Sequence, residues 1–154
     1  MKTRLHYDRV APGVYEAMDP LDRYLQDCAI ERRLLWLVQL RASQINGCAY
    51  CLDMHWKDLR AAGENEQRLY SLDAWRECPY YSERERAALG WTEAVTLAAA
   101  GHVPDQVYDE ARAHLNEKEL ADLTLAVAAI NAWNRLSIAA RLRPGTYEAA
   151  KGAA

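Results

Sequence analysis

Two cysteines and a histidine lie close together near residue 50, where Cys48-Ala49-Tyr50-Cys51 is followed by His55. On an α-helix, Cα atoms three residues apart are separated by roughly 5 Å, within the range of about 4.4–6.8 Å that a disulfide requires. Cys48 and Cys51 can therefore form and break a disulfide with little backbone movement. His55 follows Cys51 by four residues, so its imidazole can hydrogen-bond the Cys51 sulfur, whereas Cys48 is two turns away.

This asymmetry suggests a role for each thiol. A free thiol has a pKa of about 8.5 and is mostly protonated at neutral pH, and a helix N-terminus favours the thiolate by only about 0.3–1 kcal/mol. A neighbouring base must supply the rest, and only Cys51 has one within reach. We expect Cys51 to be the attacking thiolate and Cys48 the resolving thiol. The opposite assignment, in which the better exposed N-terminal cysteine attacks, is not excluded by the spacing.

Two other interpretations of these residues exist. The cysteines could be small buried residues without chemistry, or they could bind zinc together with His55 and one of Cys28, Cys78 and His102. The chain has no second paired-ligand motif, so we expect no metal site. Cys28 and Cys78 are predicted to be core residues and not redox partners.

Composition and hydrophobic spacing predict the elements that must position this motif. The 154 residues, assigned to a single domain over 1–154, include only 7 glycines and 5 prolines, and no segment alternates as a strand would. We predict an all-α bundle of about six to eight helices, with the cysteine pair at the N-terminus of one helix. That helix is expected to start at Cys48, with Asn46 or Gly47 as its cap, and to end at Gly63.

The neighbouring helices are predicted from similar signals. Before the motif, helices are expected over 21–28, after a boundary at Asp19-Pro20, and over 30–45. After the motif, Ser82 and Asn116 each precede a glutamate by three residues, the pattern of a capping box. The helix that starts near Asn116 is expected to continue to Pro144-Gly145.

The charge balance restricts the partners. With 19 Lys and Arg against 22 Asp and Glu, the net charge of −3 provides no basic field for nucleic acid or acidic lipid. The N-terminal residues are too polar for a signal peptide, and no apolar run reaches the roughly 18–20 residues of a membrane helix. We expect a cytoplasmic protein, in which thiols stay reduced and four cysteines indicate chemistry more than structural bridges.

The run over 37–55, Leu-Val-Gln-Leu-Arg-Ala-Ser-Gln-Ile-Asn-Gly-Cys-Ala-Tyr-Cys-Leu-Asp-Met-His, resembles the core motif of the AhpD-like alkylhydroperoxidases. These belong to the carboxymuconolactone decarboxylase superfamily, and the resemblance extends over about 30–142. It implies an all-α fold assembled as trimers or hexamers, and peroxide reduction without a metal or organic cofactor. It also implies that Cys51 attacks the peroxide, becomes a sulfenic acid and condenses with Cys48. A dithiol reductant, a lipoylated protein in some relatives, would then reduce the disulfide.

The sequence departs from the family pattern at two positions. The glutamate that family members commonly carry twelve residues before the first cysteine is Trp36 here, and the histidine that some members place before the second cysteine is Tyr50. Three interpretations of the missing glutamate are open: another carboxylate replaces it, the activity is low, or the substrate differs. Glu93 is our candidate for a replacement carboxylate, although its position also suits an ion pair on a helix surface. Trp36 and Trp56 flank the motif and suit either an apolar site for organic hydroperoxides or ordinary core packing.

The leading functional prediction is therefore a thiol-dependent peroxidase acting in antioxidant defence, with Cys51, Cys48, His55 and Glu93 as its catalytic residues. Two alternatives remain at this stage. A lactone decarboxylase like the other branch of the superfamily would not need a redox-active cysteine pair. A redox-sensing oligomer, weakly catalytic or not catalytic at all, would be consistent with Trp36 in place of the glutamate.

Overall fold

A computed structural model describes residues 2–149, and these residues form helices and no strand. The helices, in chain order, are α1 (Tyr7–Val10), α2 (Gly13–Gln26), α3 (Arg32–Asn46), α4 (Ala49–Ala61), α5 (Glu66–Tyr70), the 3-10 helix η1 (Leu72–Glu77), α6 (Glu83–Thr96), α7 (Ala98–Gly101), α8 (Asp105–His114) and α9 (Glu117–Ala140). The all-α prediction is confirmed. The helices outnumber the expected six to eight because α1 and α7 are single turns and η1 follows α5 directly.

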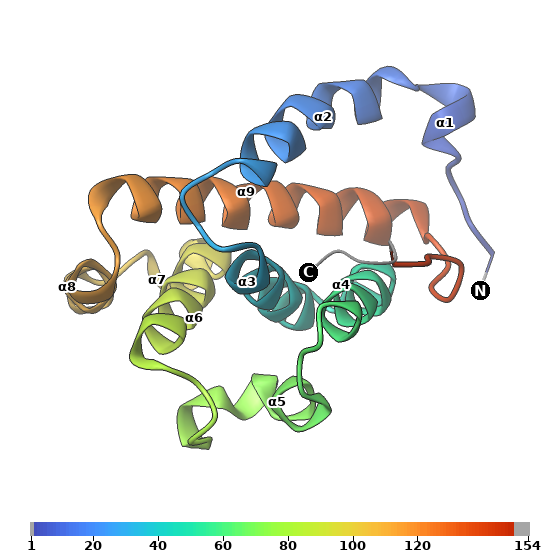
Figure 1. Cartoon of the computed structure of the whole chain (residues 1–154). Helices are drawn as coiled ribbons and strands as arrows, with labels where there is room; N and C mark the ends of the chain where they lie inside the picture. The colour runs from blue at the N-terminus through green and yellow to red at the C-terminus, as the bar shows by residue number, and fades with distance from the viewer. Residues whose placement is uncertain (1, 150–154) are drawn as a thin grey trace.

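The long helix α9 runs through the middle of the molecule, with α1 and α2 on one side of it and α3, α4 and α6 on the other (Figure 1). Helix α3 packs against α4, α6 and α9. It buries apolar side chains in consecutive positions as well as at helical spacing, among them Leu34, Leu35, Leu37 and Val38. A helix that is apolar around most of its circumference belongs in the interior of a bundle. The cysteine motif therefore follows directly after α3, a helix of the interior.

Both predicted capping boxes are present. The side chains of Ser82 and Asn116 accept the backbone N–H groups of Glu85 and Glu119, and each glutamate accepts the N–H of its cap in return. Each box satisfies two backbone donors that the first helical turn leaves unpaired. The starts of α6 and α9 were therefore predictable from four residues each.

Two predicted helix boundaries are wrong. Helix α2 continues through the expected break at Asp19-Pro20, because Pro20 removes one backbone donor while the inner face of the helix remains packed against α9. Helix α9 ends at Ala140, before Pro144, because Arg141 adopts a left-handed conformation with φ 54° and closes the last turn. Residues 141–149 then leave the helix and turn back.

These residues, which we call the C-terminal strap, lie across α4. The backbone N–H of Gly145 donates to the Asp53 carboxylate at 2.9 Å, and the Lys57 ammonium donates to the carbonyl of Tyr147 at 2.9 Å. The Tyr147 hydroxyl donates to the Asp58 carboxylate at 2.6 Å. Three polar contacts therefore hold the strap against the helix that carries Cys51 and His55.

Within residues 2–149, no helix combines the length and the apolar character needed to cross a membrane.

Candidate active site

The connection between α3 and α4 is a tight turn that places Cys48 at the start of α4. Gly47 has φ 68°, and the N–H groups of Gly47 and Cys48 donate to the carbonyls of Gln44 and Ser43, closing the end of α3. Cys48 is itself the N-cap of α4, and its sulfur accepts the N–H of Cys51 at 3.4 Å. The prediction that Asn46 or Gly47 would be the cap is wrong, because both serve the end of α3 and its contact with α9.

Buried amides anchor this turn. The Asn46 side chain donates to the side-chain oxygens of Asn131 and Asn134 on α9, at 3.0 and 2.8 Å. Asn134, which is fully buried, donates in turn to the Ser43 hydroxyl at 3.0 Å. These hydrogen bonds hold the C-terminal end of α3, and with it the cysteine motif, against α9.

Cys48 and Cys51 form a disulfide in this structure, with their Cα atoms 5.4 Å apart. Each cysteine is only 1% exposed. Cys28 and Cys78 are free, partly buried and packed against the core, as the sequence predicted. Within residues 2–149, no group of three or more Cys, His, Asp or Glu side chains is arranged to hold a metal ion. The zinc interpretation therefore has no ligand set in the described part of the chain.

His55 lies one turn after Cys51 on α4 and is 5% exposed. Neither of its ring nitrogens has a hydrogen-bond partner among the described residues. Burial alone lowers the pKa of His55 to about 4, so its imidazole is neutral at physiological pH. A buried imidazole without partners costs stability, and such groups are found where chemistry needs them. A neutral His55 is suited to accept a proton.

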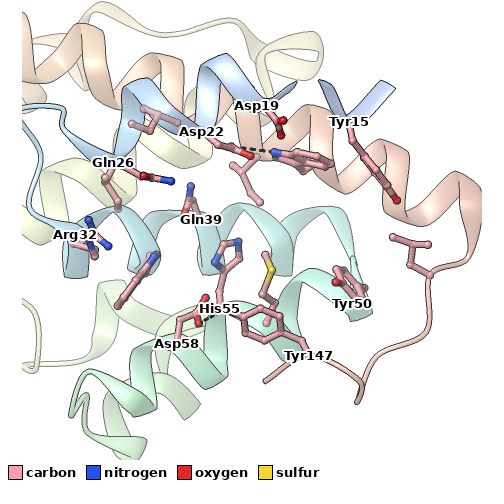
Figure 2. Close-up of a pocket in the computed structure, with 17 residues that line it drawn as sticks. Tyr15, Asp19, Asp22, Gln26, Arg32, Gln39, Tyr50, His55, Asp58 and Tyr147 are labelled. Atoms are coloured by element: carbon pink, nitrogen blue, oxygen red, sulfur yellow. Dashed lines mark hydrogen bonds between the residues drawn. The ribbon is translucent and has the colours of Figure 1, made fainter. Parts of the chain in front are cut away.

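His55 faces a cavity of about 760 Å³ between α2, α3, α4, α9 and the C-terminal strap (Figure 2). This volume is within the usual range for sites that bind small organic molecules. The lining side chains are Tyr15, Asp19, Asp22, Leu25, Gln26, Arg32, Leu35, Trp36, Gln39, Tyr50, Met54, His55, Asp58, Ile130, Trp133, Leu142 and Tyr147. Neither cysteine is among them, so of the three candidate catalytic residues Cys48, Cys51 and His55, His55 is the one that lines the cavity in the disulfide form.

Two half-buried carboxyl groups line the cavity from different helices. Asp22 on α2 accepts the indole N–H of Trp133 at 3.1 Å, and Asp58 on α4 accepts the Tyr147 hydroxyl (Figure 2). Burial raises the pKa of both carboxyl groups, and these hydrogen bonds oppose the increase only in part. Among the described residues, no Lys, Arg or His forms an ion pair with either of them. The cavity therefore contains two carboxyl groups whose negative charges are not neutralised.

Glu93 lies on α6 in an ion-pair network. Its carboxylate accepts from Arg41 and from the Trp75 indole through one oxygen, and from Arg76 through the other, each at 2.8 Å. Glu93 is not among the cavity-lining residues, and no hydrogen bond joins it to His55. The structure thus brings Cys48, Cys51 and His55 together. Glu93 forms ion pairs instead, which is the second interpretation that its position in the sequence allowed. A catalytic role for Glu93 stays a prediction.

The two tryptophans that flank the motif have different positions. Trp36 lines the cavity, with the Arg32 guanidinium 6.0 Å from its ring centre. Trp56 does not line it and stacks on Tyr70 with ring centres 6.5 Å apart. The position that resembles the family glutamate is therefore in the cavity, and in this chain an indole occupies it.

Sequence reasoning missed Asp22, Asp58 and Tyr147 as cavity residues. Asp58 could have been found, because it follows His55 by three residues on the same helix and shares its face. Asp22 and Tyr147 carry no local signal. They reach the cavity only because α2 packs against α9 and the strap turns back over α4.

The described residues form helices, and a redox-capable cysteine pair lies at the start of one of them, one turn before a buried histidine. These features define the class of protein as all-α with a candidate redox site. The carboxymuconolactone decarboxylase family model matches residues 12–94, more than half of the chain. The chain belongs to this family, in its AhpD-like branch.

Individual relatives agree with this assignment. The uncharacterized protein YdfG of Bacillus subtilis (strain 168) is 44% identical over 139 residues, 90% of this chain and 95% of that protein. A candidate antioxidant-defence protein, AhpD, of unknown function from Agrobacterium tumefaciens superposes with a TM-score of 0.91 at 42% identity, covering 95% of this chain and all of that one. The debrominase Bmp8, solved with 2,3,4-tribromopyrrole, has a TM-score of 0.79 at 20% identity, covering 88% of this chain and 73% of its own. At that identity Bmp8 shares the fold alone.

Proposed function

We propose that this protein is a thiol-dependent peroxidase that reduces organic hydroperoxides. The observation that carries the proposal is the position of a neutral, unpaired His55 one turn from Cys51, between the cysteine pair and a cavity of about 760 Å³. An imidazole there can take the proton of the Cys51 thiol, and Cys48 is already close enough to form the disulfide.

The chemistry balances with the residues present and one external reductant. The Cys51 thiolate attacks the outer oxygen of the hydroperoxide, the O–O bond breaks, and the leaving oxygen takes a proton to become an alcohol. Cys51 is oxidised to a sulfenic acid, which condenses with the Cys48 thiol and releases water. An external dithiol, such as a reduced dithiol protein or a lipoylated protein, then restores both thiols by exchange.

The cavity walls favour an organic substrate over hydrogen peroxide. Aromatic rings from five parts of the chain line it, namely α2, α3, α4, α9 and the strap, and they belong to Tyr15, Trp36, Tyr50, Trp133 and Tyr147. An apolar hydroperoxide would bury surface against these rings, whereas hydrogen peroxide has none to bury. We therefore propose a higher kcat/KM for an aromatic hydroperoxide than for hydrogen peroxide.

We also propose that the protein acts in the cytoplasm, where dithiol reductants are available, and assembles as a homo-oligomer, a trimer or hexamer. An apolar groove between α2 and α9 supports the assembly. Its lining includes Val14, Ala17 and Met18 from α2 and Ala132, Leu136 and Ala139 from α9. Light scattering should give a mass three or six times that of one chain, and Ala139→Glu should reduce it. A monomeric mass for the wild-type protein would contradict the assembly.

The test of the activity is steady-state consumption of cumene hydroperoxide and hydrogen peroxide with excess dithiothreitol. Cys51→Ser and His55→Ala should lose turnover in this assay. In a separate reaction without dithiothreitol, reduced Cys48→Ser should consume about one equivalent of hydroperoxide and leave a sulfenic acid at Cys51 that dimedone traps. Cys28→Ser and Cys78→Ser are matched controls, because these thiols lie outside the cavity, and they should retain turnover.

Full turnover in Cys51→Ser would overturn the proposal. No turnover in the wild-type protein, combined with a change of oligomeric mass when the disulfide forms, would favour the redox-sensing alternative. Turnover of a carboxymuconolactone would favour the decarboxylase alternative.

A further inference from the structure

The imidazole of His55 has two nitrogens, and the proposed reaction uses only one of them. The nitrogen that receives the Cys51 proton turns the ring into an imidazolium, whose other N–H then needs an acceptor inside a nearly dry site. In the disulfide form, residues 2–149 provide no such acceptor, since neither nitrogen has a hydrogen-bond partner among them, and burial lowers the pKa of His55 to about 4. A buried imidazolium without a counter-charge is strongly disfavoured.

Asp58 is placed to be that acceptor. It follows His55 by three residues on α4, so the two side chains share one helix face, and helical side chains lean toward the N-terminus, which directs Asp58 back toward His55. Both residues line the same cavity (Figure 2). The Tyr147 hydroxyl binds one carboxylate oxygen of Asp58, and the other makes no hydrogen bond with a described residue.

The remaining charged and titratable groups around the cavity fit this role less well. Asp22 comes from α2, and the Trp133 indole holds one of its oxygens. Asp19 is exposed, and Arg32, the one cationic side chain of the lining, lies over the Trp36 ring. The strap contributes the Tyr147 phenol and the apolar Leu142, and α9 contributes only Ile130 and Trp133. Among these groups, Asp58 is the carboxylate that shares a helix with His55.

We propose that Asp58 is the positioning residue of the site, which binds the second ring nitrogen of His55 in the reduced protein and stabilises the imidazolium formed when Cys51 loses its proton. This inference rests on the proposed function. The proton moves from Cys51 Sγ to His55. After the thiolate has formed the S–O bond and the O–O bond has broken, the same proton moves to the leaving oxygen. Asp58 keeps its charge throughout, and Tyr147 orients its carboxylate.

The opposite pKa shifts of the two groups support the pairing. Burial raises the pKa of Asp58, opposed in part by the hydrogen bond from Tyr147, and burial lowers the pKa of His55, because in each group the loss of water disfavours the charged form. A contact between the carboxylate and the imidazolium removes both penalties. Asp58 thus supplies from α4 a carboxylate to a cavity in which α3 contributes the indole of Trp36.

The experiment measures the pKa of the Cys51 thiol by the ultraviolet absorbance of its thiolate. The protein carries Cys28→Ser, Cys48→Ser and Cys78→Ser, so that Cys51 is the one thiol, and the spectrum of the same protein with Cys51→Ser is subtracted. Asp58→Asn should raise the thiol pKa by about one unit, which lowers the thiolate fraction roughly tenfold at neutral pH. Asp58→Glu should keep the thiol pKa near that of the parent.

Two comparisons make the test specific. In a His55→Ala background, Asp58→Asn should no longer raise the thiol pKa and should lower it slightly, because only repulsion between the carboxylate and the thiolate remains. Asp22→Asn is the matched control, since Asp22 is equally half-buried in the same cavity, and it should not raise the thiol pKa.

An unchanged pKa in Asp58→Asn, or the same increase with and without His55, would overturn the inference. Asp58→Asn preserves the shape of the side chain and an oxygen that accepts from Tyr147. Should it still fail to fold, a thiol pKa in Asp58→Glu that rises as far as in His55→Ala would overturn the inference as well. The thiol titration uses no hydroperoxide, so an inactive wild-type protein would defeat the proposed function without deciding the role of Asp58.

Discussion

The sulfur of Cys48 accepts the backbone N–H of Cys51 at 3.4 Å, so the proposed resolving cysteine is also the N-cap of the helix that carries the proposed attacking cysteine. The same atom therefore stabilises the first turn of α4 and forms the disulfide. In the reduced protein, the helix N-terminus favours negative charge on this sulfur as well. Substitution of Cys48 therefore affects both the stability of α4 and the disulfide chemistry.

The two effects of Cys48 can be separated by substitution. Cys48→Ala should lower the free energy of unfolding of the reduced protein by about 1 kcal/mol relative to Cys48→Ser, because serine retains an N-cap acceptor and alanine does not. Urea unfolding under excess reductant measures this difference. Equal stabilities would show that the capping contact has no energetic role. Both variants should lose the intramolecular disulfide, since neither has a resolving thiol.

His55 should make the protein sensitive to acid. Its pKa is about 4 in the folded state, against an ordinary value of 6.5, so the unfolded chain binds an extra proton between these pH values. The free energy of unfolding should therefore fall as the pH is lowered from 6.5 to 4, by up to about 3 kcal/mol. Denaturant titrations across this interval measure the slope, and His55→Gln should reduce it.

The comparison with His55→Gln is needed because the carboxyl groups of Asp22 and Asp58 also make the stability depend on pH. The folded pKa values of Asp22 and Asp58 are raised, so their contribution to stability is largest at low pH and is lost as the pH rises. That dependence is opposite in sign to the one from His55. Because both carboxyl groups are present in His55→Gln, the difference between the two proteins isolates the imidazole. An equal slope in both would contradict a neutral, buried His55.

Asn134 should contribute to stability well beyond its size. Asn134→Ala leaves the Asn46 amide and the Ser43 hydroxyl without their buried partner, and each such group costs roughly 1–3 kcal/mol. Denaturant unfolding should show this loss, and peroxide turnover should fall with it because the turn before Cys48 loosens. The control is Gln106→Ala, an exposed amide on α8, which should change stability by less than about 0.5 kcal/mol. Similar effects of the two substitutions would rule out the anchoring role.

Glu93→Gln should weaken the contact between α3 and α6. Arg41 is largely buried and would lose its anionic partner, at a cost of roughly 1–3 kcal/mol in the free energy of unfolding. Glu117→Gln is the control, since Glu117 is 88% exposed and its pair with Arg112 should contribute little. A relay role for Glu93 would require, in addition, that turnover per folded molecule decreases. Unchanged stability would mean that the ion pair is not structural.

The relationships within one helix were determined by the sequence alone. The spacing of Cys48, Cys51 and His55 dictates that the thiols can join and that the imidazole lies one turn from the second of them, because helical geometry is the same in every fold. The capping boxes at Ser82 and Asn116 are predictable for the same reason. The family motif, which is also a local pattern, identified the all-α fold.

Only the tertiary structure decided which distant side chains complete the site. Asp22 and Tyr147 reach the cavity of His55 through packing of α2 on α9 and through the return of the strap over α4. Glu93 forms ion pairs on α6 because Arg41 and Arg76 reach it there, a choice between ion pair and relay that the sequence left open. Contacts between helices depend on which faces become buried together, and that outcome is a property of the whole core and of no single segment.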